Sequence, residues 1–191
     1  MSTVPTKRYT PQEYLELERK AETKSEYYRG EIFAMSGASR AHNRIAMNLS
    51  ALVWNQLRGR PCDVFGSDMR VKVEISGLYT YPDLSALCGE PQFDDEHTDT
   101  LLNPSVLVEV LSPSTEDYDR GGKFELYRQI ESLREYVVVA QDRLLVEHHT
   151  RQDDGSWRLV DYKDKGGELH LASIECRLRL EDIYDKVEFP Q

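Results

Sequence analysis

One carboxylate stands inside the most apolar segment of the chain. Residues 105–111 read Ser-Val-Leu-Val-Glu-Val-Leu, so Glu109 interrupts a nearly continuous hydrophobic run. Such a run predicts a central strand buried on both faces. A carboxylate buried there is costly unless it is paired, protonated or bound to a metal ion. Glu109 is therefore a candidate for chemistry, although a glutamate at a strand end that reaches solvent or an arginine would give the same pattern.

A second carboxylate, Asp83, follows Pro82 within the strand-like stretch 79–87. If this strand neighbours the Glu109 strand, the two carboxylates converge at one end of the sheet. Their repulsion would raise one pKa or recruit a cation. Mg²⁺ suits such a site because it prefers oxygen ligands and keeps several waters. The backbone carbonyl of Val110 would add a further oxygen.

A cation, Lys123, lies in the first turn of the helix expected after the Glu109 strand. Tyr127 lies one turn later on the same helix face. From this position Lys123 would reach back toward the carboxylates and stabilise charge that develops on a phosphoryl group or an attacking water. The alternative is an ordinary surface lysine.

The elements that must position these residues are predicted as a mixed α/β single domain. Residues 1–8 are expected to be a disordered arm, followed by one domain over 9–191. A capping box of Thr10 and Glu13 begins the first helix, which runs to Lys20. The other expected helices cover 40–57, 119–131 and 180–184. The expected strands cover 31–35, 69–75, 79–87, 105–111 and 136–140, followed by a C-terminal meander over 143–150, 157–162 and 168–171.

The order Pro82-Asp83, then Glu109, resembles the signature of the PD-(D/E)XK nuclease superfamily. The lysine that should close the signature is replaced by Leu111, and Lys123 fits the members that carry this lysine on the following helix. The stretch 108–115, Val-Glu-Val-Leu-Ser-Pro-Ser-Thr, with its downstream Lys123 and Tyr127, resembles the bacterial Uma-type endonuclease family more closely. The resemblance covers about residues 10–185.

This resemblance implies a restriction-endonuclease-like fold and a function for each matching residue. Asp83, Glu109 and Val110 would bind Mg²⁺, with Mn²⁺ as a substitute, and Lys123 would be the catalytic lysine. Glu31 resembles the extra acidic residue of such sites, or is a solvent-facing strand glutamate. His42 would border the site, or is a polar residue that merely opens a helix. The resemblance also implies a DNA substrate and a homodimer.

The charge distribution bears on that substrate. The 191 residues contain 24 Lys+Arg and 34 Asp+Glu, a net charge of −10, which disfavours general adhesion to nucleic acid. The stretch 32–62 nevertheless contains four arginines and no acid, so Arg40 and Arg44 are candidates for phosphate contacts, although an ordinary basic helix surface would look the same. Arg70 and Lys72 would extend this surface. An acidic loop over 90–99 should point away from DNA or cap the site.

Cysteine usage and hydropathy point to the cytoplasm. The three cysteines, Cys62, Cys88 and Cys176, are far apart in the sequence, and we expect three ordinary thiols in a reducing compartment. No apolar run approaches the roughly 18 residues that span a bilayer, so we expect no membrane partner.

Two functions remain after these considerations. The first is a Mg²⁺-dependent endonuclease that hydrolyses phosphodiester bonds, in DNA, with a metal-activated water. The second is a non-catalytic, dimeric interaction module of the same fold with a vestigial metal site. Divalent cation binding that depends on Asp83 and Glu109 separates them.

Overall fold

A six-stranded mixed sheet forms the centre of the protein. The computed structural model describes residues 7–113 and 115–189. The strand order is β11-β10-β9-β8-β6-β3, with β8 and β9 parallel and every other neighbouring pair antiparallel. The strands are β3 (Cys62–Gly66), β6 (Leu84–Cys88), β8 (Val106–Val110), β9 (Glu135–Val139), β10 (Val146–Arg151) and β11 (Trp157–Tyr162). All five residues of β8 are buried, so the expected central strand is confirmed.

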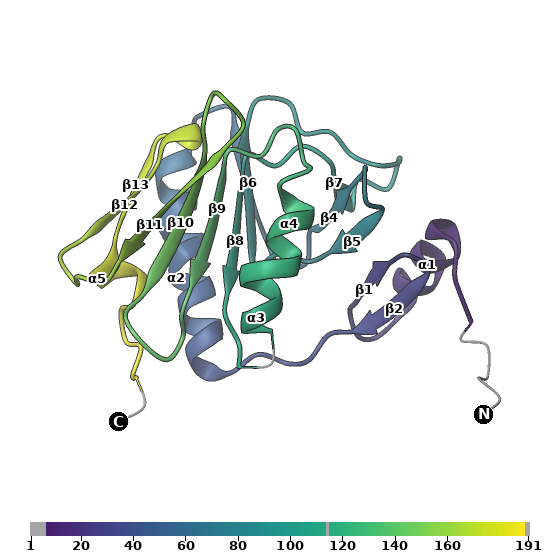
Figure 1. Ribbon diagram of the computed structural model, residues 1–191, viewed down its shortest axis with the longest axis horizontal. Helices are drawn as coiled ribbons and strands as arrows, with labels where there is room; N and C mark the ends of the chain where they lie inside the picture. The colour runs from purple at the N-terminus through teal and green to yellow at the C-terminus, as the bar shows by residue number, and fades with distance from the viewer. Residues whose placement is uncertain (1–6, 114, 190–191) are drawn as a thin grey trace.

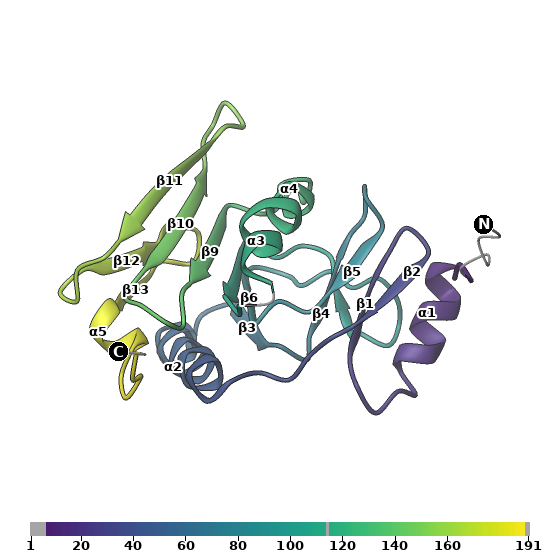
Figure 2. The ribbon, with the colours of Figure 1, turned by 60° about the horizontal axis from the view of Figure 1, so that its bottom comes forward.

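Helices cover both faces of this sheet (Figures 1 and 2). On one face, α2 (Arg40–Leu57) buries Ile45, Leu49 and Val53 against the even-numbered valines of β8. On the other face lie α3 (Glu116–Tyr118), a π-helical turn η1 (Asp119–Lys123) and α4 (Phe124–Tyr127). The expected helix 119–131 is therefore shorter and begins with a π turn. Because side chains alternate along a strand, Glu109 belongs to the face that carries η1 and α4.

A second, five-stranded mixed sheet stands beside the first, in the order β2-β1-β5-β4-β7. Its strands are β1 (Ser25–Tyr28), β2 (Glu31–Ala34), β4 (Arg70–Val73), β5 (Leu78–Thr80) and β7 (Thr100–Leu101). Helix α1 (Pro11–Glu18) packs on it through Tyr14, which stacks on Tyr27. The capping box of Thr10 and Glu13 is present, as predicted.

The expected strand 79–87 is wrong as a single element. Residues 78–80 belong to the five-stranded sheet and residues 84–88 to the six-stranded sheet. Tyr81-Pro82-Asp83 connects them, and proline explains the break because it cannot donate to a strand ladder. Asp83 is thereby held at the junction between the two sheets.

The C-terminal segment departs from a simple meander. Strands β9, β10 and β11 form an antiparallel meander in the main sheet, but β12 (Glu168–Leu171) pairs with β13 (Cys176–Arg179) instead of with β11. A short 3-10 turn, η2 (Ala172–Ile174), joins β12 to β13. Helix α5 (Leu180–Ile183) then ends beside α2, since Asn48 donates to the carbonyl of Ile183 at 2.9 Å.

The expectation of three free thiols is wrong for two of them. Cys62 and Cys88 face each other on the antiparallel strands β3 and β6 and form a disulfide, whereas Cys176 is a buried free cysteine. The two cysteines are 26 residues apart in the sequence, and only the register of β3 and β6 brings them close enough for a disulfide.

Two further expectations concern the chain ends and the membrane. Most of the expected arm, residues 1–6, lies outside the described residues, while Arg8 contacts Glu31 at 3.8 Å. Within the described ranges, no helix is both long enough and apolar enough to cross a bilayer.

Candidate active site

Glu109 is buried and is held by two groups from the helical layer above it. Its side chain is 6% exposed. Lys123 Nζ lies 3.0 Å from Glu109 Oε1, and the Tyr127 hydroxyl donates to the same oxygen at 2.7 Å. The interpretation of Lys123 as a surface lysine is therefore wrong, because the structure places it directly against Glu109.

Three carboxylates surround Lys123. Besides Glu109, Nζ lies 3.1 Å from Glu26 Oε1 and 3.7 Å from Asp119 Oδ1. Asp119 and Lys123 are the first and last residues of the π turn, and Tyr127 follows one turn later. The π turn thus directs Asp119, Lys123 and Tyr127 to the same side, toward β8. Such turns are frequent at functional sites.

Asp83 lies beside Glu109 at the adjoining strand end. The register of β6 and β8 pairs Leu84 with Val108, so Asp83 comes next to Glu109 in the ladder. Asp83 Oδ2 accepts the backbone N–H of Val110 at 2.8 Å and lies 3.1 Å from His42 Nε2. The prediction that the two carboxylates converge at one end of neighbouring strands agrees with this arrangement.

His42 is positioned by the beginning of α2. Ser39 caps this helix by accepting the His42 N–H at 3.0 Å. Gln141, which follows β9, accepts a hydrogen bond from the Ser39 hydroxyl and donates to the carbonyl of Leu111 at 2.7 Å. The ends of β8 and β9 are thereby tied to the helix start that presents His42 to Asp83. His42 Nδ1 is buried and has no hydrogen-bond partner among the described residues.

The cluster contains more carboxyl groups than cations. Burial raises the pKa of Glu109 to about 8. The positive charge of Lys123 lowers this pKa, whereas the negative charges of Asp119 and Asp83 raise it. Burial also raises the pKa of Asp119. Burial alone would lower the pKa of Lys123, but Glu109, Glu26 and Asp119 outweigh it and raise that pKa well above its ordinary value. Lys123 is thus shared by three carboxyl groups, with a fourth, Asp83, beside Glu109, so an added cation would favour the ionised form of Glu109.

The donor set fits a hard divalent cation held by few protein ligands. The hydrogen bond from Tyr127 and the shortest approach of Lys123 both use Glu109 Oε1, and the contacts of Asp83 with the described residues Val110 and His42 both use Oδ2. The second oxygen of each carboxylate is thus the one left for a cation. Within residues 7–113 and 115–189, no three His, Cys, Asp or Glu side chains form a metal-binding group. Mg²⁺ needs no such cage, because it is usually bound by one or two carboxylates, waters and substrate phosphates.

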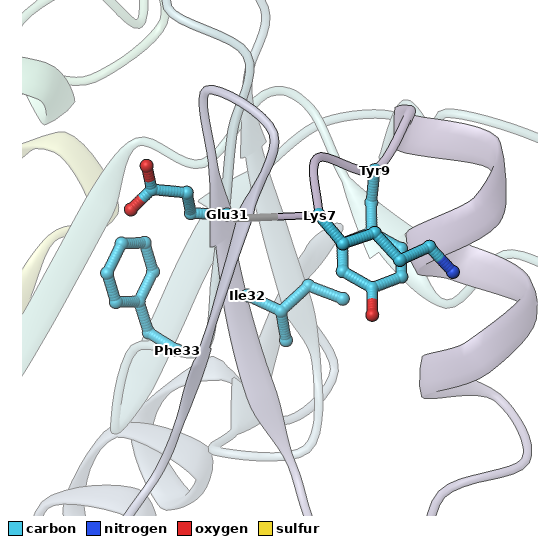
Figure 3. Close-up of a pocket in the computed structure, with 5 residues that line it drawn as sticks. All are labelled: Lys7, Tyr9, Glu31, Ile32 and Phe33. Carbon is cyan, nitrogen blue, oxygen red and sulfur yellow. The ribbon is translucent and has the colours of Figure 1, made fainter. Parts of the chain in front are cut away.

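Glu31, the predicted extra acidic residue, is not brought to Lys123. It lies on the edge strand β2, its side chain is 46% exposed, and it pairs with Arg8. It lines a surface cavity of about 370 Å³ with Lys7, Tyr9, Ile32 and Phe33 (Figure 3). The position next to Lys123 is taken by Glu26, on the inner strand β1. Glu26 is not among the predicted site residues, because the short strand β1 is not predicted, although Ser-Glu-Tyr-Tyr before the Arg29-Gly30 turn is a signal for a hairpin.

The predicted basic surface is smaller than expected. Arg40 and Arg44 line a cavity of about 420 Å³ at the start of α2, together with Pro113, which follows β8, and Gln141, which follows β9. Arg70 and Lys72 do not extend this surface, because the acidic loop neutralises them.

The acidic loop over 90–99 forms ion pairs with lysine and arginine side chains of this protein. Lys72 pairs with Asp94, and the buried Arg70 lies 2.9 Å from Asp99. Arg19, the C-cap residue of α1, also binds Asp99, at 2.8 Å. The acidic residues of the loop therefore link the end of α1 to β4.

Comparisons with known proteins give one family and one fold. The model of the Uma2 family, described as "Putative restriction endonuclease", matches residues 11–181. Two relatives from Synechocystis sp. (strain PCC 6803) are similar over nearly their whole length. The "Uncharacterized protein slr1290" is 37% identical over 98% of this chain and 97% of its own, and the "Uncharacterized protein sll1609" is 38% identical over 92% and 99%.

A solved structure has the same fold. The crystal structure of a "putative nuclease belonging to DUF820" from Anabaena variabilis matches with a TM-score of 0.77 and 18% identity, and covers 94% of this chain and 99% of that chain. At this identity the likeness concerns the mixed α/β fold alone.

Proposed function

Because the chain belongs to the Uma2 family, we propose that it is a Mg²⁺-dependent nuclease that hydrolyses phosphodiester bonds in DNA. The observation that carries the proposal is the buried cluster in which Lys123 faces Glu109, with Asp83 at the adjoining strand end. Two carboxylates and one lysine are the groups that metal-assisted phosphoryl transfer requires. This cluster lies on a mixed sheet, at β6 and β8, between α2 on one face and the α3–α4 layer on the other.

Asp83 and Glu109 would hold the cation through the oxygens that their internal contacts leave open, with the carbonyl of Val110 as a further ligand. The bound cation would supply a nucleophilic water and charge neutralisation at the phosphate. Lys123 keeps its proton, since three carboxylates raise its pKa, so its role is to donate to the phosphate oxygens rather than to act as a base. Tyr127 and His42 are positioning residues for Glu109 and Asp83.

Phosphate binding would come from the start of α2. Arg40 and Arg44 share their cavity with residues that follow β8 and β9, so a backbone held there would run toward the carboxylates. With few arginines available, DNA binding is expected to be weak and dependent on the metal ion.

The test is cleavage of plasmid and of short single-stranded DNA with Mg²⁺ or Mn²⁺. Wild type should cut, whereas Lys123→Met and Asp83→Asn, verified as folded by circular dichroism, should lose at least 100-fold in rate. Lys163→Met is the matched control, because Lys163 forms an exposed ion pair with Asp161 and its loss should leave the rate unchanged. Equal cutting by wild type and Lys123→Met would remove Lys123 from the mechanism.

The non-catalytic module is the outcome if the site does not bind metal. Calorimetry with Mn²⁺ should show binding that Asp83→Asn and Glu109→Gln abolish. Absence of both Mn²⁺ binding and cleavage would favour the interaction module.

A further inference from the structure

Two aromatic side chains next to the cluster are unusually exposed. Among the described residues, Phe33 is 48% exposed and Tyr118 is 41% exposed. Phe33 belongs to the hairpin that supplies Glu26, and Tyr118 directly precedes Asp119. Isolated exposed apolar residues need no explanation, but these two rings flank one charged cluster from two different elements.

Phe33 shares a strand face with Glu26. The register of β1 and β2 places the two residues directly opposite each other, where side chains lie on the same face about 5 Å apart. Figure 3 shows Phe33 and Glu31 pointing to one side of β2, while Ile32 points to the other side, toward Tyr9. The Phe33 ring is therefore on the face from which Glu26 reaches Lys123.

Tyr118 belongs to the helical layer that supplies Lys123. Its ring lies against Gly122, where an added Cβ would come within 3.1 Å of it, so the glycine next to Lys123 makes room for the ring. Burial raises the pKa of the Tyr118 phenol, and the charge of Glu26 acts in the same direction.

We propose that Phe33 and Tyr118 stack on nucleobases, and that the substrate of this site is single-stranded or locally unpaired DNA rather than continuous duplex. This inference rests on the proposed nuclease function. Every base presents a π-face to an aromatic ring, whereas a duplex keeps those faces inside its own stack. Stacking on uncharged bases needs no positive charge, so it would add affinity beside a cluster that offers a phosphate only Lys123 and a bound cation.

Binding separates this inference from catalysis. Fluorescence anisotropy would follow a labelled 12-nucleotide single strand and the corresponding duplex with Ca²⁺ in place of Mg²⁺. Phe33→Leu and Tyr118→Leu keep apolar volume and remove the ring, while Phe33→Tyr and Tyr118→Phe keep the ring. Trp54→Leu is the matched control, since Trp54 is an aromatic residue 53% exposed near the far end of α2.

Wild type should bind the single strand at least tenfold more tightly than the duplex. Each leucine variant should lose roughly 5- to 100-fold for the single strand and change little for the duplex. The variants that keep a ring, and Trp54→Leu, should remain within twofold of wild type.

The outcomes distinguish this inference from the proposed function. Loss of single-strand binding in the leucine variants supports it even if no strand is ever cut. Cutting of duplex and single strand at equal rates, with the leucine variants unaffected, would overturn it and leave the nuclease intact. Failure of wild type to bind the single strand would also overturn it.

Discussion

Removal of the lysine charge from the buried cluster should destabilise the fold. Lys123→Met keeps the length of the side chain and leaves Glu109, Glu26 and Asp119 without their shared partner. At an effective dielectric constant of 20, a contact near 3 Å is worth about 5 kcal/mol of attraction. Desolvation and relaxation offset much of this, so the expected loss of unfolding free energy is about 3–5 kcal/mol. For a chain of this size, that lowers Tm by roughly 6–20 °C.

A double-mutant cycle makes the prediction specific to the pair. Urea unfolding in EDTA would compare Lys123→Met, Glu109→Gln and the double variant. Because Glu109 and Lys123 are 3.0 Å apart, their losses should fall short of additivity by about 1–3 kcal/mol. Lys163→Met, in an exposed pair of 2.8 Å, should cost less than about 0.5 kcal/mol. Additive losses, or equal losses for Lys123→Met and Lys163→Met, would refute the account of the cluster.

Three further predictions concern the disulfide, an acidic residue and the metal site. Reduction of Cys62–Cys88, which closes a loop of 26 residues, should cost about 3 kcal/mol; thermal unfolding with and without reductant measures this, and an unchanged Tm would contradict it. The hydrogen bond from the Arg19 guanidinium holds the pKa of Asp99 well below its ordinary value of 3.8. This contribution to stability is present above that pH and is lost as the pH falls further, so Asp99→Asn should flatten the acid limb of unfolding; an equally steep limb would show that Asp99 contributes nothing. His42→Ala should weaken Mn²⁺ binding in calorimetry by roughly 10- to 100-fold, because it removes the side chain that orients the metal ligand Asp83. Unchanged affinity would show that His42 does not orient Asp83.

The sequence predicts the strands and side chains whose patterns are local. Glu109 interrupts an apolar run, and the spacing of Lys123 and Tyr127 gives their common helix face, so these three residues could be predicted to lie together. The capping box at Thr10 and the helix over 40–57 are equally local, and the structure confirms both.

Features that depend on strand register could not be read in this way. Glu26 reaches Lys123 only because β1 is an inner strand of the second sheet, whereas the predicted Glu31 lies on the edge strand. The disulfide likewise depends on the register of β3 and β6. Arg70 and Lys72 look like free cations in the sequence, and only the folded acidic loop shows that they are neutralised.

The central claim is that Asp83 and Glu109 hold a divalent cation beside Lys123. Anomalous diffraction from a crystal soaked in Mn²⁺ tests it most directly. We expect one anomalous peak at coordination distance from an oxygen of each carboxylate, with Lys123 Nζ still in contact with Glu109. Absence of a peak at these carboxylates, in a crystal that diffracts as well as the unsoaked one, would contradict it.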